Sequence, residues 1–120
     1  MIQITVNDLE KERLKNYAEY SLYENKHWGN GKLFIHEENI LYSKLNSPEN
    51  KIHLSSGELK ILINWFLEGT GDGTILLSED ITILQKLINV LKERFKLTPS
   101  DKSIKSSLSF LREILEKNKI

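Results

Sequence analysis

One stretch, Leu59-Lys60-Ile61-Leu62-Ile63-Asn64-Trp65-Phe66-Leu67, decides how this chain folds, because only two of its residues are polar. At about 100° per residue, four of its apolar residues share one face of a helix: Leu59, Leu62, Ile63 and Phe66. Ile61 and Trp65, four residues apart, add a second apolar stripe beside that face. A helix that is apolar almost all round belongs in the middle of a fold. We therefore expect a central buried helix over residues 56–68.

Polar and small residues mark both ends of this helix. Ser55 followed by Glu58 is a capping box, in which each side chain accepts a hydrogen bond from the other residue's backbone amide. Gly69 stands where a helix can end in a left-handed residue. The glycines from Gly69 to Gly73 are interpreted as a connector and not as a phosphate loop, because no helix begins directly after them and no Gly-Lys-Ser/Thr follows.

The chain before the central helix predicts strands and one further helix. Ile2, Ile4 and Val6 alternate with polar residues, which is typical of a half-buried strand. A capping box of Asn7 and Glu10 opens a helix expected from residue 8 to about residue 24. Its expected buried face consists of Leu14, Tyr17, Ala18, Ser21 and Leu22. Residues 32–36 and 40–45 are β-prone runs, which we expect to form a hairpin around the three residues between them.

Two more helices are expected after the glycine connector. Ser78 caps the first of them, whose apolar face consists of Ile81, Leu84, Leu87, Ile88, Leu91 and Phe95. Thr98 and Pro99 open the last helix as a cap followed by proline at the first helical position. Its apolar face consists of Ile104, Leu108, Leu111 and Leu115, widened by Phe110 and Ile114.

The expected fold class is therefore α+β. A small antiparallel sheet, made of the N-terminal strand and the hairpin, packs with about four helices, of which the one over residues 56–68 is buried at the centre. At 120 residues, the chain is expected to form a single domain over residues 1–120.

Composition excludes several classes of site. Seventeen basic and seventeen acidic residues cancel, so a strong overall attraction to nucleic acid or lipid is not expected. The absence of cysteine excludes disulfides, thiolate zinc sites and a cysteine nucleophile, and it fits a reducing cytoplasm. No signal peptide is visible at the N-terminus, and no apolar run approaches the roughly 18 residues of a membrane helix.

No constellation of residues predicts catalysis, a metal or a cofactor. The three histidines are His27, His36 and His53, and none forms an i, i+4 pair. His36, Glu37 and His53 could converge on a metal, but surface histidines are the favoured interpretation. No pair of acids is placed by a recognisable motif, and no Gly-x-Ser-x-Gly sequence is present. We therefore expect a protein that is not an enzyme and holds no cofactor.

The best candidate for a binding surface is aromatic. Tyr20, Tyr23, His27 and Trp28 gather at the end of the first helix and in the loop after it. Tyrosine and tryptophan dominate the energetics of protein interfaces, so these four residues are predicted to bind another protein. In the alternative interpretation, Trp28 folds back onto the core and Tyr20 covers the edge of the sheet.

Two other functions remain open. Residues 92–120 carry eight Lys/Arg against four acids, so the basic last helix could serve a nucleic-acid-binding regulator. A self-assembling structural or accessory protein is a further alternative.

Two segments carry a resemblance to a known group of proteins: Ile52-His53-Leu54-Ser55-Ser56-Gly57-Glu58-Leu59 and Leu76-Leu77-Ser78-Glu79-Asp80-Ile81. With them, the whole chain resembles the small cysteine-free proteins of temperate phages that infect low-GC Gram-positive bacteria. Within that group it is similar to the phage anti-defence proteins that inhibit a defence-associated sirtuin. The resemblance implies a non-catalytic inhibitor that binds a large bacterial NADase and suppresses its NAD-depleting response. It assigns no residue to the site.

Overall fold

The structure is a computed structural model, which describes residues 2–27, 36–70 and 76–118, without the side chains of residues 22–27. Contacts divide the chain into two compact units, Met1–Ile75 and Leu76–Ile120, and each unit is described by itself. The described residues are mostly helical with a small antiparallel sheet, which agrees with the α+β class. The single domain expected from chain length stays a prediction.

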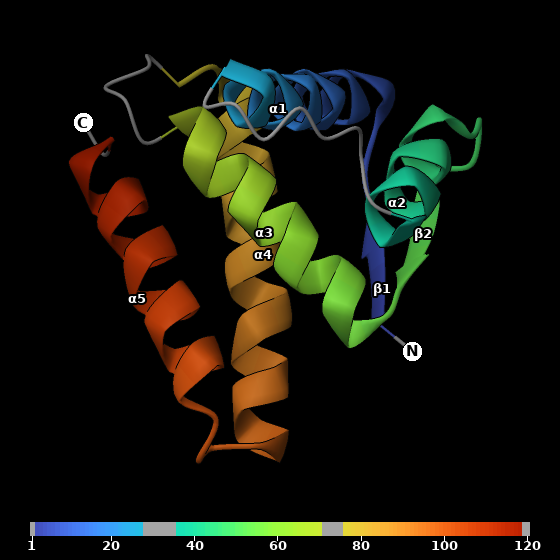
Figure 1. Cartoon of the computed structure of the whole chain (residues 1–120). Helices are drawn as coiled ribbons and strands as arrows, with labels where there is room; N and C mark the ends of the chain where they lie inside the picture. The colour runs from blue at the N-terminus through green and yellow to red at the C-terminus, as the bar shows by residue number, and fades with distance from the viewer. Residues whose placement is uncertain (1, 28–35, 71–75, 119–120) are drawn as a thin grey trace. The chain divides into compact units, whose positions relative to one another are not determined.

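The first unit surrounds the predicted central helix with elements that precede it in the chain (Figure 1). Its elements in order are β1 (Ile2–Thr5), α1 (Asp8–His27), α2 (His36–Asn46), β2 (Lys51–Leu54) and α3 (Ser56–Thr70). α3 packs against α1, α2 and β2. The buried apolar side chains of α3 are Leu59, Leu62, Ile63, Trp65 and Phe66, and Trp65 is only 1% exposed. The prediction of a central buried helix is confirmed, with its end two residues later than expected.

The sheet has a different second strand from the one predicted. β1 pairs antiparallel with β2, so that Ile4 lies opposite Ile52. The predicted hairpin is wrong, because residues 36–46 form the helix α2; residues 32–35 lie outside the described part of the chain. Two acids in the first turn of α2 and Lys44 in its last turn complement the helix dipole. Leu41 and Leu45, one helical turn apart, are both buried.

A tyrosine ring explains Gly69, which the sequence predicted as a C-terminal cap. The cap prediction is wrong, because α3 continues through Thr70, whose hydroxyl donates to the Phe66 carbonyl at 2.7 Å. A Cβ on Gly69 would lie 2.1 Å from Cδ1 of Tyr17, so this position must lack a side chain. The Tyr17 ring also meets the ring of Phe66 edge to face, with centroids 5.6 Å apart. α1 and α3 therefore approach each other closely at this point.

The second unit contains an antiparallel pair of helices, α4 (Ser78–Leu97) and α5 (Lys102–Lys117) (Figure 1). Most of the buried apolar residues of the pair belong to the predicted faces: Leu84, Leu87, Ile88, Leu91, Ile104, Leu108 and Leu111. Ile83 is buried although the prediction omitted it, whereas Ile81, Phe95 and Leu115 are only half-buried. Phe110 departs from its prediction, since it is 56% exposed.

The helix starts in the second unit differ from the predicted ones. Leu77 occupies the N-cap position of α4, so Ser78 is already helical, and the Leu77 amide donates to Asp80 at 2.8 Å. The prediction that Thr98 caps the last helix is wrong, because its amide and hydroxyl donate to the Arg94 carbonyl and end α4. Asp101 caps α5 by accepting from the amides of residues 103 and 104. A carboxylate is favoured there because it also complements the positive end of the helix dipole.

The contact between Tyr17 and Gly69 predicts unequal effects of alanine at two glycines of α3. Gly69→Ala should lower the free energy of unfolding by about 1–3 kcal/mol or more, because the new methyl group overpacks the site against an aromatic ring. The change should appear as a lower urea midpoint in equilibrium unfolding, with an unchanged slope.

Gly57→Ala is the matched control in the same helix. Its Cβ would lie 3.0 Å from the carboxylate of Glu37, the mobile end of a side chain, which can move away. Because alanine favours a helix over glycine by about 1 kcal/mol, this variant should be neutral or more stable. Equal losses in the two variants would contradict the role assigned to Gly69.

Candidate functional site

α1 exposes two large apolar side chains that are not part of the core. Leu9 is 62% exposed and Tyr20 is 38% exposed, whereas Leu14, Tyr17 and Ala18 are buried. Leu9 and Tyr20 are eleven residues apart, close to three helical turns, so they share one stripe of the helix. We call this stripe, with the exposed acids beside it, the outer face of α1.

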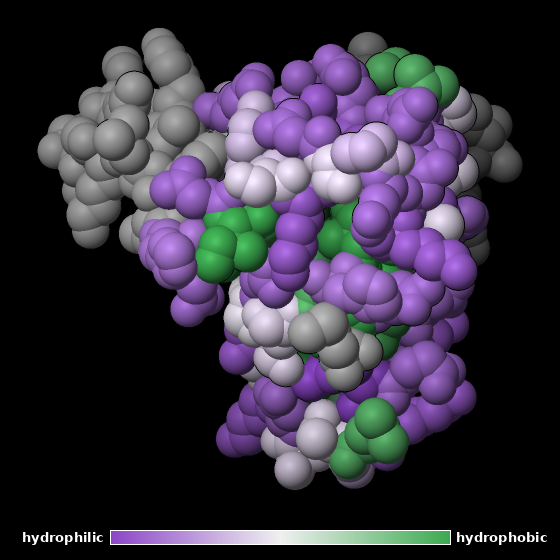
Figure 2. Space-filling view, turned by 90° about the vertical axis from the view of Figure 1, so that its right-hand side faces the viewer, coloured by the Kyte–Doolittle hydropathy of each residue, from purple (hydrophilic) through white to green (hydrophobic). Residues whose placement is uncertain are grey.

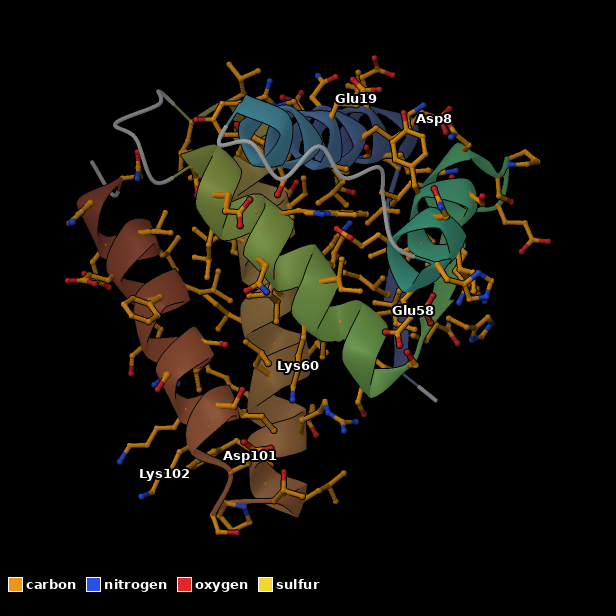
Figure 3. The ribbon with its side chains drawn as sticks, in the orientation of Figure 1. Asp8, Glu19, Glu58, Lys60, Asp101 and Lys102 are labelled. Atoms are coloured by element: carbon orange, nitrogen blue, oxygen red, sulfur yellow. The ribbon has the colours of Figure 1, made fainter. Side chains whose placement is uncertain are left out.

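The acids of the outer face are Asp8, Glu12 and Glu19, all of them exposed. Asp8 and Glu19 lie on the side of α1 that is turned away from α3 (Figure 3). Their cationic neighbours are spaced loosely: Lys11 Nζ is 3.9 Å from Asp8, and Lys15 Nζ is 4.0 Å from Glu12. Exposed pairs of this kind contribute little free energy. The outer face therefore carries two exposed apolar side chains, Leu9 and Tyr20, with Arg13 and Asn16 between them on the same stripe and acids beside it.

Hydrogen bonds to the neighbouring elements hold α1 in place. The ammonium of Lys11, whose side chain is nearly buried, donates to the carbonyls of Ser47 and Glu49 at 2.9 and 2.8 Å. The hydroxyl of Tyr42 on α2 donates to Glu19 at 2.6 Å, and this hydrogen bond raises the pKa of Tyr42 above its usual value. Because α1 is fixed in this way, its outer face is presented on a rigid support, which lowers the entropy cost of binding.

The structure describes one of the four predicted binding side chains. Tyr20 lies on the outer face of α1. Tyr23 and His27 belong to the same helix, but their side chains lie outside the described residues, as does the whole of Trp28. The grouping of these four residues therefore stays a prediction. The sequence reasoning missed Leu9 and the acids, although a helical projection of residues 8–20 already separates Leu9 from the apolar inner face.

A small cleft of about 140 Å³ lies on another part of the first unit, and its lining residues are Lys44, Ser47, Glu49, Lys51, Ile52 and His53. The ammonium of Lys44 donates to the carbonyl of His53 at 2.7 Å and to Oε1 of Glu58 at 3.0 Å. Its charge is therefore already balanced, and we interpret the cleft as a structural junction of α2, β2 and α3. On this side of the molecule, apolar residues form small separate groups among hydrophilic ones (Figure 2).

Glu58, labelled in Figure 3, is the carboxylate at the centre of this junction. Its Oε1 accepts from the Ser55 amide at 2.8 Å, and the Glu58 amide donates to the Ser55 hydroxyl at 3.1 Å, which confirms the predicted capping box. Oε2 lies 2.9 Å from Lys44 Nζ but makes no directed hydrogen bond, so it gains only the charge attraction. Burial alone would raise the pKa of Glu58, but the hydrogen bonds from Ser55 and Lys44 together lower it below its ordinary value.

The histidines do not assemble a metal site in the part of the chain that the structure describes. His36 begins α2, which corrects its predicted place in a strand, and His53 lies in β2. Both side chains are exposed. Within residues 2–27, 36–70 and 76–118, no three His, Asp or Glu side chains are close enough together to hold a metal ion.

None of the helices among the described residues has the length and apolar character that crossing a membrane requires. Comparison of the chain with models of known families, with curated proteins and with solved structures found no match.

The capping carboxylate predicts a stability that depends on pH. A lowered pKa in the folded state means that Glu58 stabilises the fold above its ordinary value of 4.5, and that this stabilisation is lost as the pH falls through the folded-state pKa. Glu58→Gln should therefore be less stable than the wild type at neutral pH, by about 1–3 kcal/mol for a hydrogen-bonded charged group. The difference should shrink in acid, as measured by denaturant unfolding at several pH values.

Glu93→Gln provides the control, because Glu93 also pairs with a lysine but is mostly exposed. Its stability should stay close to that of the wild type at every pH. A gap between Glu58→Gln and the wild type that stays constant down to acidic pH would contradict the role of the Glu58 charge.

Proposed function

We propose that this chain is a non-catalytic protein-binding module that uses the outer face of α1. In the fuller form of the proposal, it is a temperate-phage inhibitor that acts in the cytoplasm of the bacterial host, where it binds and suppresses a defence NADase. The observation that supports the binding role is the exposure of Leu9 and Tyr20 on a helix that also buries Leu14, Tyr17 and Ala18 in the core. The whole-chain resemblance to phage anti-defence proteins supports the choice of partner.

The chemistry of the stripe fits recognition of another protein. Tyrosine brings a large and rigid amphipathic surface to an interface and is enriched among the residues that dominate binding energy. Two further predicted binding residues, Tyr23 and His27, follow Tyr20 in the same helix. Non-obligate interfaces mix apolar and polar residues in this way, with tyrosine and arginine enriched.

The acids of the outer face define the complementary surface. Asp8, Glu12 and Glu19 would attract a partner that carries lysine or arginine around an apolar patch. Charges at the rim act mainly on the association rate, which falls as salt screens them. We expect association to slow with rising ionic strength, while the dissociation rate changes little.

Affinity capture tests the proposal directly. The tagged chain should retain one stoichiometric partner from bacterial lysate. In a separate assay, it should lower the rate at which the purified defence NADase consumes NAD. Tyr20→Ala, Tyr23→Ala and Trp28→Ala should each weaken the complex, by about tenfold or more if the residue is an interface hot spot. Binding is measured by surface plasmon resonance, and folding is checked by circular dichroism.

Phe110→Ala is the control, because it removes an aromatic side chain that is more exposed than Tyr20 but belongs to the second unit. It should bind as the wild type does. If the Phe110 variant loses the partner while the Tyr20 variant keeps it, the outer face of α1 is not the binding surface. If no partner is retained at micromolar concentration, the proposal that this chain is a protein-binding module is wrong.

The second candidate function is nucleic-acid binding by α5. Lys102, Lys105 and Arg112 are all exposed and follow one another at helical spacing, with Ser109 as the residue between the last two on that stripe. Within the described residues, none of these three cations is in a salt bridge. A row of unpaired cations on one helix is able to contact successive phosphates.

A salt titration separates this candidate from the first. Three phosphate contacts predict that the logarithm of the DNA affinity falls with the logarithm of the salt concentration with a slope of about −3. Lys105→Ala should reduce that slope by about one, as measured by fluorescence anisotropy on duplex DNA. A flat titration at low salt would remove α5 from consideration.

A further inference from the structure

The two-stranded sheet of the first unit has two edges, and among the described residues only the edge of β2 has a hydrogen-bond partner. On the outer edge of β2, the carbonyl of His53 accepts the ammonium of Lys44 at 2.7 Å, and α2 packs against this strand. The outer edge of β1 is therefore the edge at which another strand could pair.

The register of the sheet shows which backbone groups β1 turns outward. In an antiparallel pair, residues that exchange hydrogen bonds alternate with residues whose N–H and C=O groups point away from the partner strand. The Val6 amide donates to the Asn50 carbonyl at 2.9 Å, in register with the pair Ile4 and Ile52. These are therefore the bonded pairs, and the backbone groups of Gln3 and Thr5 point away from β2.

The opposite strand supports this alternation. His53 lies opposite Gln3 in the register, so its carbonyl should also point away from the ladder. The hydrogen bond from Lys44 to that carbonyl, on the far side of β2, agrees with this direction. The alternation thus holds on both strands.

The outward groups of β1 have no partner among the described residues. Apart from the ladder itself, no hydrogen bond to Gln3 or Thr5 occurs within the part of the chain that the structure describes. Both residues are exposed. Open edges are normally protected by a short strand, a charge, a proline or a bulge; the strand Ile2-Gln3-Ile4-Thr5 is short but contains no charge and no proline. The edge offers two donors and two acceptors to an added strand.

We infer that β1 pairs antiparallel with β1 of a second copy of this chain, about a two-fold axis at Ile4. Gln3 of one copy then lies opposite Thr5 of the other, and each such pair exchanges two backbone hydrogen bonds. The axis generates this pair twice, so all four outward groups of each copy are satisfied. The two small sheets join into one sheet of four strands in the order β2, β1, β1, β2.

A second copy fits this edge for two reasons visible in the strand. The donors and acceptors of Gln3 and Thr5 are complementary to themselves under a two-fold rotation, which is the property that a symmetric dimer interface requires. The strand is also uncharged, so no like charges meet across the axis. A strand this short buries less area than a standard interface, so the dimer should be weak and reversible.

Sedimentation velocity tests the dimer with the full chain. The sedimentation coefficient of the wild type should rise from the monomer value toward the dimer value between about 10 µM and 1 mM, the range of weak dissociation constants. Gln3→Pro removes an outward amide of β1 and adds a ring at the edge, so it should stay monomeric. Lys51→Pro is the matched control, because it makes the same change at an outward amide of β2, at the first position of the strand, where proline is tolerated. It should dimerise as the wild type does.

The register is tested by cross-linking, which is simple because the chain has no cysteine. In the inferred dimer, the Cα atoms of Gln3 and of Thr5 in the second copy are about 5.5 Å apart, within the range of a disulfide. Two copies of the same position are diagonal neighbours at about 7–8 Å, which is too far. An oxidised equimolar mixture of Gln3→Cys and Thr5→Cys should therefore form covalent dimers, and either variant alone should form several-fold fewer.

Three results would overturn the inference. They are a wild type that stays monomeric over the whole range, a Gln3→Pro variant that is folded by circular dichroism and dimerises normally, and cross-linking that is equal in the mixture and in the single variants. If the wild type is monomeric and Gln3→Pro lowers capture of the partner protein, the edge belongs to a strand of that partner. The inference does not depend on the proposed inhibitor function, since Tyr20→Ala tests that function and leaves β1 unchanged.

Discussion

The first unit depends on the contact between the Tyr17 ring and the bare backbone of Gly69. It brings α1 close to α3, where Tyr17 also packs edge to face on the buried ring of Phe66. The guanidinium carbon of Arg13 lies over the Tyr17 ring, 5.1 Å from its centroid. Since one side of α1 is fixed by these contacts, the rotation of the helix about its axis is fixed as well. That rotation is what turns Tyr20 outward.

The two surfaces proposed for interaction differ in chemistry. The outer face of α1 offers side chains, so its specificity depends on the identity of residues such as Leu9 and Tyr20 and on the acids beside them. The edge of β1 offers backbone groups, so it responds to any change that removes an amide and is tolerant of changes in side chain. Because they belong to different elements of the first unit, each can be altered by mutation without touching the other.

The sequence by itself determined the features that depend on neighbouring residues. The apolar periodicity of residues 59–67 predicted a buried helix, and the box of Ser55 and Glu58 placed its start, because both signals act within two helical turns. The alternation of Ile2, Ile4 and Val6 likewise predicted β1. For the site, the sequence named Tyr20 as a binding residue, and the structure shows its side chain exposed on α1.

Only the tertiary structure decided the features that join distant parts of the chain. Residues 36–46 combine β-prone side chains with helix-favouring ends, and their burial against α1 and α3 selects the helix. The strand that pairs with β1 is Lys51–Leu54, for which the sequence pattern indicates only a short extended segment before α3. Glycine at position 69 is typical of a helix cap. Only the Tyr17 ring, 52 residues earlier, shows that this glycine instead allows a close contact between two helices. Local patterns carry no information about such partners, because the chain must first fold to bring them together.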